Sequence, residues 1–97
     1  MTRDEVIAFL SSHRQEIQER FGVSSLALFG STARDEAGPG SDVDVLVDFS
    51  ETPGLSDYMR LKFWLEDSLG RQVDLVMRRA LKSWARPLVE AEAIRVA

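Results

Sequence analysis

The sequence predicts an α/β (α+β) protein in which helices flank a small mixed β-sheet. Segments with helical periodicity alternate along the chain with apolar runs of strand length. These runs are short, as expected of strands buried between helices. Hydrophobic residues make up 44% and charged residues 29% of the 97 residues, which is an ordinary globular composition. We therefore expect one domain over residues 1–97, with the order helix, strand, helix, strand, helix, strand, helix.

The first predicted helix covers residues 3–21, where apolar side chains recur at helical spacing. Thr2 and Glu5 fit a capping box at its start, and Gly22 is a natural helix stop. The one histidine of the sequence, His13, falls on the polar side of this helix. We expect His13 to be solvated rather than a ligand.

The next elements lead to an alternating strand. Residues 24–29 form a short apolar run that ends at Gly30, followed by a short helix over 31–36 and a loop over 37–41. The strand predicted over 42–49 sends successive side chains to opposite faces. One face carries Asp42, Asp44, Leu46 and Asp48, and the other carries Val43, Val45, Val47 and Phe49.

The remaining elements repeat this alternation. Pro53 and Gly54 form a turn, and residues 55–69 form a helix with recurring apolar positions. Residues 72–77 are the third strand candidate. A final helix over 82–93 leads into a short extended segment.

Composition excludes several classes of function. The chain has no cysteine, which excludes disulfides and thiolate metal sites. The net charge is −4 and no dense basic stripe marks a nucleic-acid surface. The N-terminal segment is too charged for a signal peptide, and no run approaches the roughly 18 apolar residues of a membrane span. We therefore expect a cytoplasmic protein, and we interpret one basic cluster as a solvated helix end: Arg78, Arg79, Lys82 and Arg86.

Two carboxylates open the second strand. Asp42 and Asp44 are two residues apart, so they share a face and can converge on one point. Such a pair repels and resists desolvation, so a cation must offset it. A lysine or arginine can do this, although none is adjacent; Mg²⁺, which prefers oxygen ligands, suits the pair.

A third carboxylate, Asp74, lies in the predicted strand over 72–77. If that strand neighbours the second strand, Asp74 joins Asp42 and Asp44, and three carboxylates can hold two metal ions. Asp48 shares the face but lies about 13 Å beyond Asp44 at the rise of a strand, so we leave it out of the site.

Gly30 and Ser31 end a strand and open a helix. Free backbone N–H groups and a hydroxyl at such a turn favour phosphate, and glycine allows close approach of the backbone. Arg34, one turn further on, either reaches the same phosphates or is a surface residue of the helix.

Gly30-Ser31, ten further residues and Asp42-x-Asp44 together resemble the signature of the DNA polymerase β-like nucleotidyltransferase superfamily. The short chain and its segment GSTARDEAGPGSDVDVLVDF resemble the minimal nucleotidyltransferases (MNT proteins), over roughly residues 5–95. The resemblance implies a polymerase β-like nucleotidyltransferase core that uses two Mg²⁺ ions and a nucleoside triphosphate.

The same resemblance implies roles for individual residues. Asp42, Asp44 and Asp74 would be the catalytic and metal-binding carboxylates, with Asp74 helping to hold the metal that activates the attacking hydroxyl. Gly30 and Ser31 would hold the β- and γ-phosphates. Because all five motif positions are filled, we expect an active enzyme.

MNT proteins are paired with a HEPN ribonuclease toxin in prokaryotic toxin–antitoxin modules. The resemblance therefore implies a cytoplasmic antitoxin that forms a hetero-oligomer with its toxin. It would neutralise the toxin by transferring AMP from ATP to a tyrosine of that protein.

Two alternatives remain open. The chain can neutralise a partner by contact alone, with Leu55, Tyr58, Trp64 and Trp84 among the candidate anchors. For Trp64 and Phe63 we favour core packing. It can also be a nucleotidyltransferase that modifies a small molecule, although such enzymes usually carry a second domain for that substrate.

Overall fold

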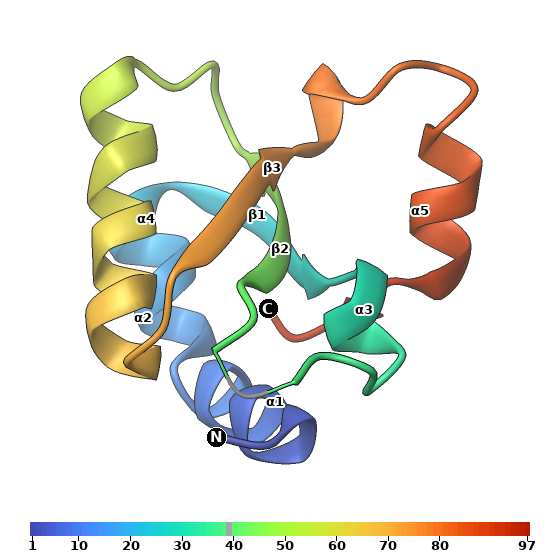
Figure 1. The fold of residues 1–97 in the computed structure, drawn as a ribbon. Coiled ribbons are helices and arrows are strands. Elements are labelled where there is room, and N and C mark those ends of the chain that lie inside the picture. The colour runs from blue at the N-terminus through green and yellow to red at the C-terminus, as the bar shows by residue number, and fades with distance from the viewer. Residues whose placement is uncertain (39) are drawn as a thin grey trace.

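The computed structural model describes residues 1–38 and 40–97 and confirms the predicted mixed class (Figure 1). Pro39, in the predicted loop, lies outside the described residues. In chain order the described elements are α1 (Arg3–Ser12), α2 (Arg14–Phe21), β1 (Val23–Leu28), α3 (Gly30–Ala33), β2 (Val43–Phe49), α4 (Leu55–Leu69), β3 (Val73–Met77), the 3₁₀ turn η1 (Arg78–Ala80), α5 (Arg86–Glu92) and β4 (Ile94–Arg95).

The strands form one mixed sheet in the order β3-β2-β1-β4. β1 is antiparallel to both β2 and β4, and β2 is parallel to β3. The parallel pair needs a crossover, which α4 provides. As predicted, the strands that carry Asp44 and Asp74 are neighbours.

The two faces of the sheet differ in burial. Val43, Val45 and Val47 of β2 are fully buried and join one hydrophobic core with residues of α1, α2 and α4. Asp44 and Asp48, on the opposite face of the same strand, are only partly buried. Figure 1 shows α2 and α4 on one side of the sheet and α3 and α5 on the other. The predicted alternation of β2 therefore separates a core face from a polar face.

The predicted single helix over 3–21 is wrong, because the helix breaks at His13. His13 has φ −102° and ψ 15°. It is the C-cap residue of α1 and the N-cap residue of α2. Its ring is half-buried and packs against other aromatic rings, so the prediction of a solvated side chain holds only in part. The ring centroid lies 4.2 Å from that of Phe9 and 6.0 Å from that of Trp64, and Nδ1 lies 2.8 Å from the carbonyl oxygen of Phe9.

Two smaller differences concern helix length. α3 ends at Ala33 rather than at residue 36, and Asp35 beyond it has a positive φ of 60°. α5 covers only Arg86–Glu92 of the predicted 82–93, because Pro87 lies in its first turn and Ala93 is already extended at ψ 138°. The extended segment predicted after it is present as β4.

The aromatic residues of α4 divide between core and surface. Trp64 packs against the core, with its ring 5.6 Å from that of Phe21 and 6.1 Å from that of Phe9, which confirms the prediction for Trp64. Phe63 is 54% exposed, so the same prediction for Phe63 is wrong. Among the described residues, no helix combines the length and the apolar character that crossing a membrane requires.

Candidate active site

The carboxylate of Asp44 lies against the turn that opens α3. Its Oδ2 accepts hydrogen bonds from the hydroxyls of Ser31 at 3.2 Å and Thr32 at 3.5 Å. In return, the backbone N–H of Asp44 donates to Thr32 Oγ1 at 2.9 Å. The backbone N–H of Phe29 also donates to the carbonyl oxygen of Asp44, at 3.1 Å. The strand β2 and the turn before α3 are therefore joined at this one aspartate.

Thr32 is a site residue that sequence reasoning missed. It is the one buried polar residue in the described part of the chain, at 5% exposure, and its hydroxyl both accepts from and donates to Asp44. The available signal was its place directly after Gly30 and Ser31. A hydroxyl in the first turn of a helix normally forms hydrogen bonds with the backbone of that helix, whereas this hydroxyl bonds to a strand.

Gly30 is required by local geometry. Its φ of +59° lies in the left-handed region, which strains any other residue. A Cβ at Gly30 would also lie 2.8 Å from Asp44 Oδ2. Within this chain the backbone of Gly30 therefore lies close to the carboxylate of Asp44, and its close approach to a phosphate stays a prediction.

Asp74 lies beside Asp44 in the sheet. The parallel register of β2 and β3 pairs Asp44 with Asp74 directly, and paired residues on neighbouring strands share a face. Asp42 precedes β2 by one residue and is exposed, as is Asp74. The backbone N–H of Val43 donates to the carbonyl oxygen of Gln72 at 2.9 Å, which continues the ladder to this end of the strands.

The donor set fits magnesium in chemistry, because all three predicted ligands are carboxylates, which are hard oxygen donors. As the side chains are placed, residues 1–38 and 40–97 contain no group of three or more histidine, cysteine, aspartate or glutamate side chains close enough to hold a metal ion. The structure thus aligns the backbone of Asp44 with that of Asp74, and the shared metal site stays a prediction. Asp48 instead faces Arg78 and Arg79, at 3.9 and 3.8 Å.

Arg34 projects from the end of α3 and is held by two carboxylates. Its Nε donates to Glu36 at 3.0 Å and its Nη1 donates to Glu92 at 2.7 Å. These hydrogen bonds, first that of Glu36 and then that of Glu92, raise the pKa of the guanidinium above its ordinary value. The other oxygen of Glu92 accepts the backbone N–H of Gly30 at 2.9 Å.

Sequence reasoning also missed Glu92. It lies 62 residues after Gly30, on a different helix, and no local pattern marks it. Only the pairing of β4 with β1 brings it to the turn.

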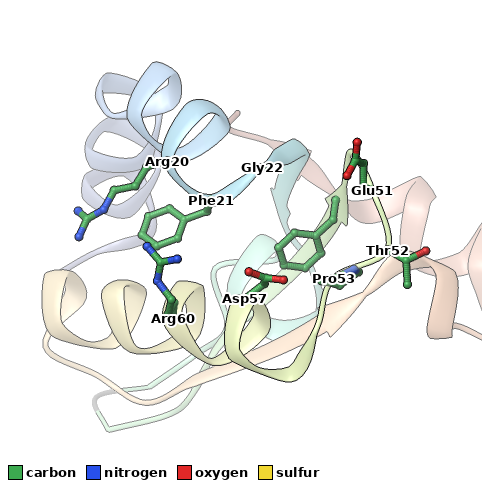
Figure 2. A pocket seen from close by; sticks show the side chains of 9 residues that line it. Arg20, Phe21, Gly22, Glu51, Thr52, Pro53, Asp57 and Arg60 are labelled. Carbon is green, nitrogen blue, oxygen red and sulfur yellow. The ribbon is translucent and has the colours of Figure 1, made fainter.

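A pocket of about 280 Å³ lies at the far end of β2, away from Asp44. Figure 2 shows Arg20, Phe21 and Arg60 on one of its sides and Glu51, Thr52 and Pro53 on another. Since its β2 residue is Phe49, five positions beyond Asp44, this pocket is separate from the aspartates. It is lined by Arg20, Phe21, Gly22, Phe49, Glu51, Thr52, Pro53, Asp57 and Arg60.

The chain resembles known proteins over nearly its whole length. A family model described as the nucleotidyltransferase domain matches residues 10–96. Protein adenylyltransferase MntA of Thermococcus cleftensis is 45% identical over 96 residues, which cover 99% of this chain and 97% of that protein.

Solved structures agree with this result. A structure described as a candidate minimal nucleotidyltransferase has a TM-score of 0.84 and 39% identity, covering 97% of this chain and 95% of the other. A chain from the complex of the tri-AMPylated HEPN toxin of Shewanella oneidensis with MNT antitoxin has a TM-score of 0.66 and 18% identity. That match covers 94% of this chain and 71% of the other, and it shows a shared fold.

Proposed function

The chain belongs to the nucleotidyltransferase domain family, and from this premise we propose that it is a Mg²⁺-dependent protein adenylyltransferase acting as an antitoxin. It transfers AMP from ATP to a tyrosine of a cognate HEPN ribonuclease toxin in the cytoplasm. The name of the relative at 45% identity supports the enzyme class, and the HEPN complex among the structural matches supports the kind of partner.

One observation carries the proposal. Asp44 is joined by hydrogen bonds to the Gly30–Ser31 turn and is aligned in register with Asp74. A phosphate-binding turn and paired carboxylates are the two parts that nucleotidyl transfer needs, because the chemistry is mostly positioning and neutralisation of charge.

Each residue has a proposed role in the reaction. Asp42, Asp44 and Asp74 would hold the magnesium ions, which supply charge neutralisation at the phosphates when they are bound. Ser31 binds the triphosphate when its hydroxyl turns from Asp44 Oδ2 to a phosphate oxygen, and Arg34 binds it through the guanidinium. Gly30 allows the turn to lie against Asp44.

The acceptor oxygen of the toxin attacks the α-phosphorus of ATP in line with the leaving group. A phosphorus–oxygen bond to the tyrosine forms as the bond to pyrophosphate breaks, and the tyrosine proton leaves to solvent. The product is AMP-tyrosine.

The test is AMP transfer to the HEPN-type protein encoded beside this chain, followed by intact mass with ATP and Mg²⁺ present. We expect the wild-type chain to add whole AMP units, and Asp44→Asn to add none while it keeps its fold by circular dichroism. Asp48→Asn is the matched control, because Asp48 shares strand and face but pairs with Arg78 and Arg79. Transfer by Asp44→Asn at the wild-type rate would refute the proposed chemistry.

Exposed apolar side chains favour a second candidate function, which is neutralisation by contact. Leu55 is 79%, Trp84 70% and Leu88 65% exposed, and such residues typically anchor protein interfaces. A groove of about 520 Å³ runs past Leu55 and Tyr58 to Met77. If Asp42→Asn still rescues the growth of cells that express the toxin, contact suffices; if rescue is lost, chemistry is needed.

A further inference from the structure

We propose that Glu92 is a positioning residue of the nucleotide site, which joins the Gly30–Ser31 turn to Arg34 through one carboxylate. The inference rests on the proposed function, since it concerns the groups that bind the triphosphate there. It adds the C-terminal helix α5 to a site otherwise built from α3, β2 and β3.

The contacts of Glu92 use both of its oxygens. Oε1 accepts the backbone N–H of Gly30 at 2.9 Å, and Oε2 accepts Nη1 of Arg34 at 2.7 Å. The side chain of Glu92 is 30% exposed and that of Arg34 is 47% exposed. One side chain therefore fixes the spacing between the turn and the guanidinium.

The backbone brings Glu92 to this place. β4 pairs with the end of β1 in antiparallel register, with Leu28 opposite Ile94. Gly30 lies two residues after Leu28 and Glu92 two residues before Ile94, so this last pair brings the two residues near each other. Further along, Val96 donates to the carbonyl oxygen of Leu26 at 2.9 Å, which secures β4.

Because Glu92 is the last residue of α5 and only Ala93 separates it from β4, the fold places its backbone close to Gly30. In this proposal the N–H of Gly30 stays with Glu92, and the triphosphate binds to Ser31 and Arg34.

This arrangement orients the guanidinium of Arg34 and still leaves it able to bind a phosphate. A guanidinium has five N–H donors in a rigid fork, and Glu36 and Glu92 each engage one nitrogen, Nε and Nη1. The remaining donors stay available to a phosphate. Holding the side chain before the nucleotide arrives reduces the entropy lost on binding.

The test measures ATP affinity by calorimetry with Mg²⁺ on the full chain. Glu92→Gln removes the charge that holds Arg34, and we expect the Kd for ATP to rise about 5-fold, the upper end for a partly exposed ion pair. Glu90→Gln is the matched control, since Glu90 lies on the same helix and pairs with Arg78 instead. It should bind ATP as the wild type does.

Two further measurements separate positioning from general stability. In an Arg34→Ala background, Glu92→Gln should cause no additional loss of ATP affinity, because it acts through Arg34. In AMP transfer, Glu92→Gln should raise KM for ATP and leave kcat unchanged. The amide proton of Gly30 should shift in the NMR spectrum of Glu92→Gln and stay in place in that of Glu90→Gln.

The outcomes are distinct. Unchanged or tighter ATP binding by Glu92→Gln, an additive loss in the Arg34→Ala background, or an unmoved Gly30 amide would each overturn the positioning role. If the wild-type chain itself binds no ATP, the proposed function fails, and the inference fails with it. ATP binding by the wild type with no change in Glu92→Gln overturns the inference alone.

Discussion

The two faces of the sheet are formed by the same strands but differ in burial and in polarity. On the core face of β2, Val43, Val45 and Val47 have no exposed surface, and this side packs under α1, α2 and α4. On the polar face, the same strand presents Asp44 to a hydrogen-bonded turn. We conclude that one face supplies stability, while the other carries charges that a buried surface would not tolerate.

The largest expected effect is on the core face. Leu65→Ala removes a fully buried side chain of α4 and should lower the free energy of unfolding by about 2–5 kcal/mol. Urea denaturation measures this loss. Phe63→Ala, on the same helix but 54% exposed, should change stability by no more than about 0.5 kcal/mol. Equal losses from the two variants would contradict the assignment of Leu65 to the core and of Phe63 to the surface of α4.

A polar contact between α3 and β2, on the polar face, gives the next effect. Thr32→Val leaves the N–H of Asp44 without its acceptor and should cost about 1–3 kcal/mol, because that group is removed from water. AMP transfer should fall as well, since Asp44 loses a hydrogen bond. Thr32→Ser keeps the hydroxyl and should retain both properties. A fully stable and active Thr32→Val would show that this hydroxyl is dispensable.

Two glycine substitutions test the close approach of Gly30 to Asp44. Gly30→Ala and Gly70→Ala both place a side chain at positive φ, 59° and 66°, and each should lose about 1–2 kcal/mol. Only at Gly30 does the new Cβ meet Asp44 Oδ2, at 2.8 Å; at Gly70 nothing lies within 4 Å. AMP transfer should therefore fail in Gly30→Ala and persist in Gly70→Ala. Equal activity in the two variants would argue against the close approach.

The smallest expected effect depends on pH. The pKa of Glu66 is lowered, chiefly because its carboxylate accepts the backbone N–H of Val73 and then because of Lys62. A lowered pKa in the folded state adds stability above the pKa of the unfolded chain, and that stability is lost as pH falls through the folded value.

Glu66→Gln should therefore be less stable than the wild type at neutral pH. This difference in stability should become smaller as the pH falls. Thermal melts over an acid-to-neutral series measure the gap. Asp67→Asn, which removes the exposed carboxylate next to it, is the control and should follow the wild type. A gap that persists at low pH would assign the effect to something other than ionisation.

Strand patterns could be predicted from the sequence, whereas contacts between distant residues could not. The alternation of residues 42–49 predicted both faces of β2, because side-chain direction in a strand follows from sequence alone. The short apolar runs located β1 and β3 to within one residue of their observed bounds.

Contacts between distant residues were not predictable in this way. Helical periodicity gave no sign of the break at His13, whose ring contacts that of Phe9 and, from a distant part of the sequence, that of Trp64. Glu92 reaches Gly30 through the register of β4, which a single sequence does not specify. The metal-binding role of Asp42, Asp44 and Asp74 stays a prediction.

The contrast between Trp64 and Trp84 has a spectroscopic consequence. Trp64 is partly buried and packs against Phe9, Phe21 and His13, whereas Trp84 is 70% exposed. Intrinsic fluorescence therefore contains two signals, and iodide should quench that of Trp84 more readily than that of Trp64. A variant that keeps Trp64 as its one tryptophan reports unfolding. A variant that keeps Trp84 as its one tryptophan reports binding to the surface around that residue.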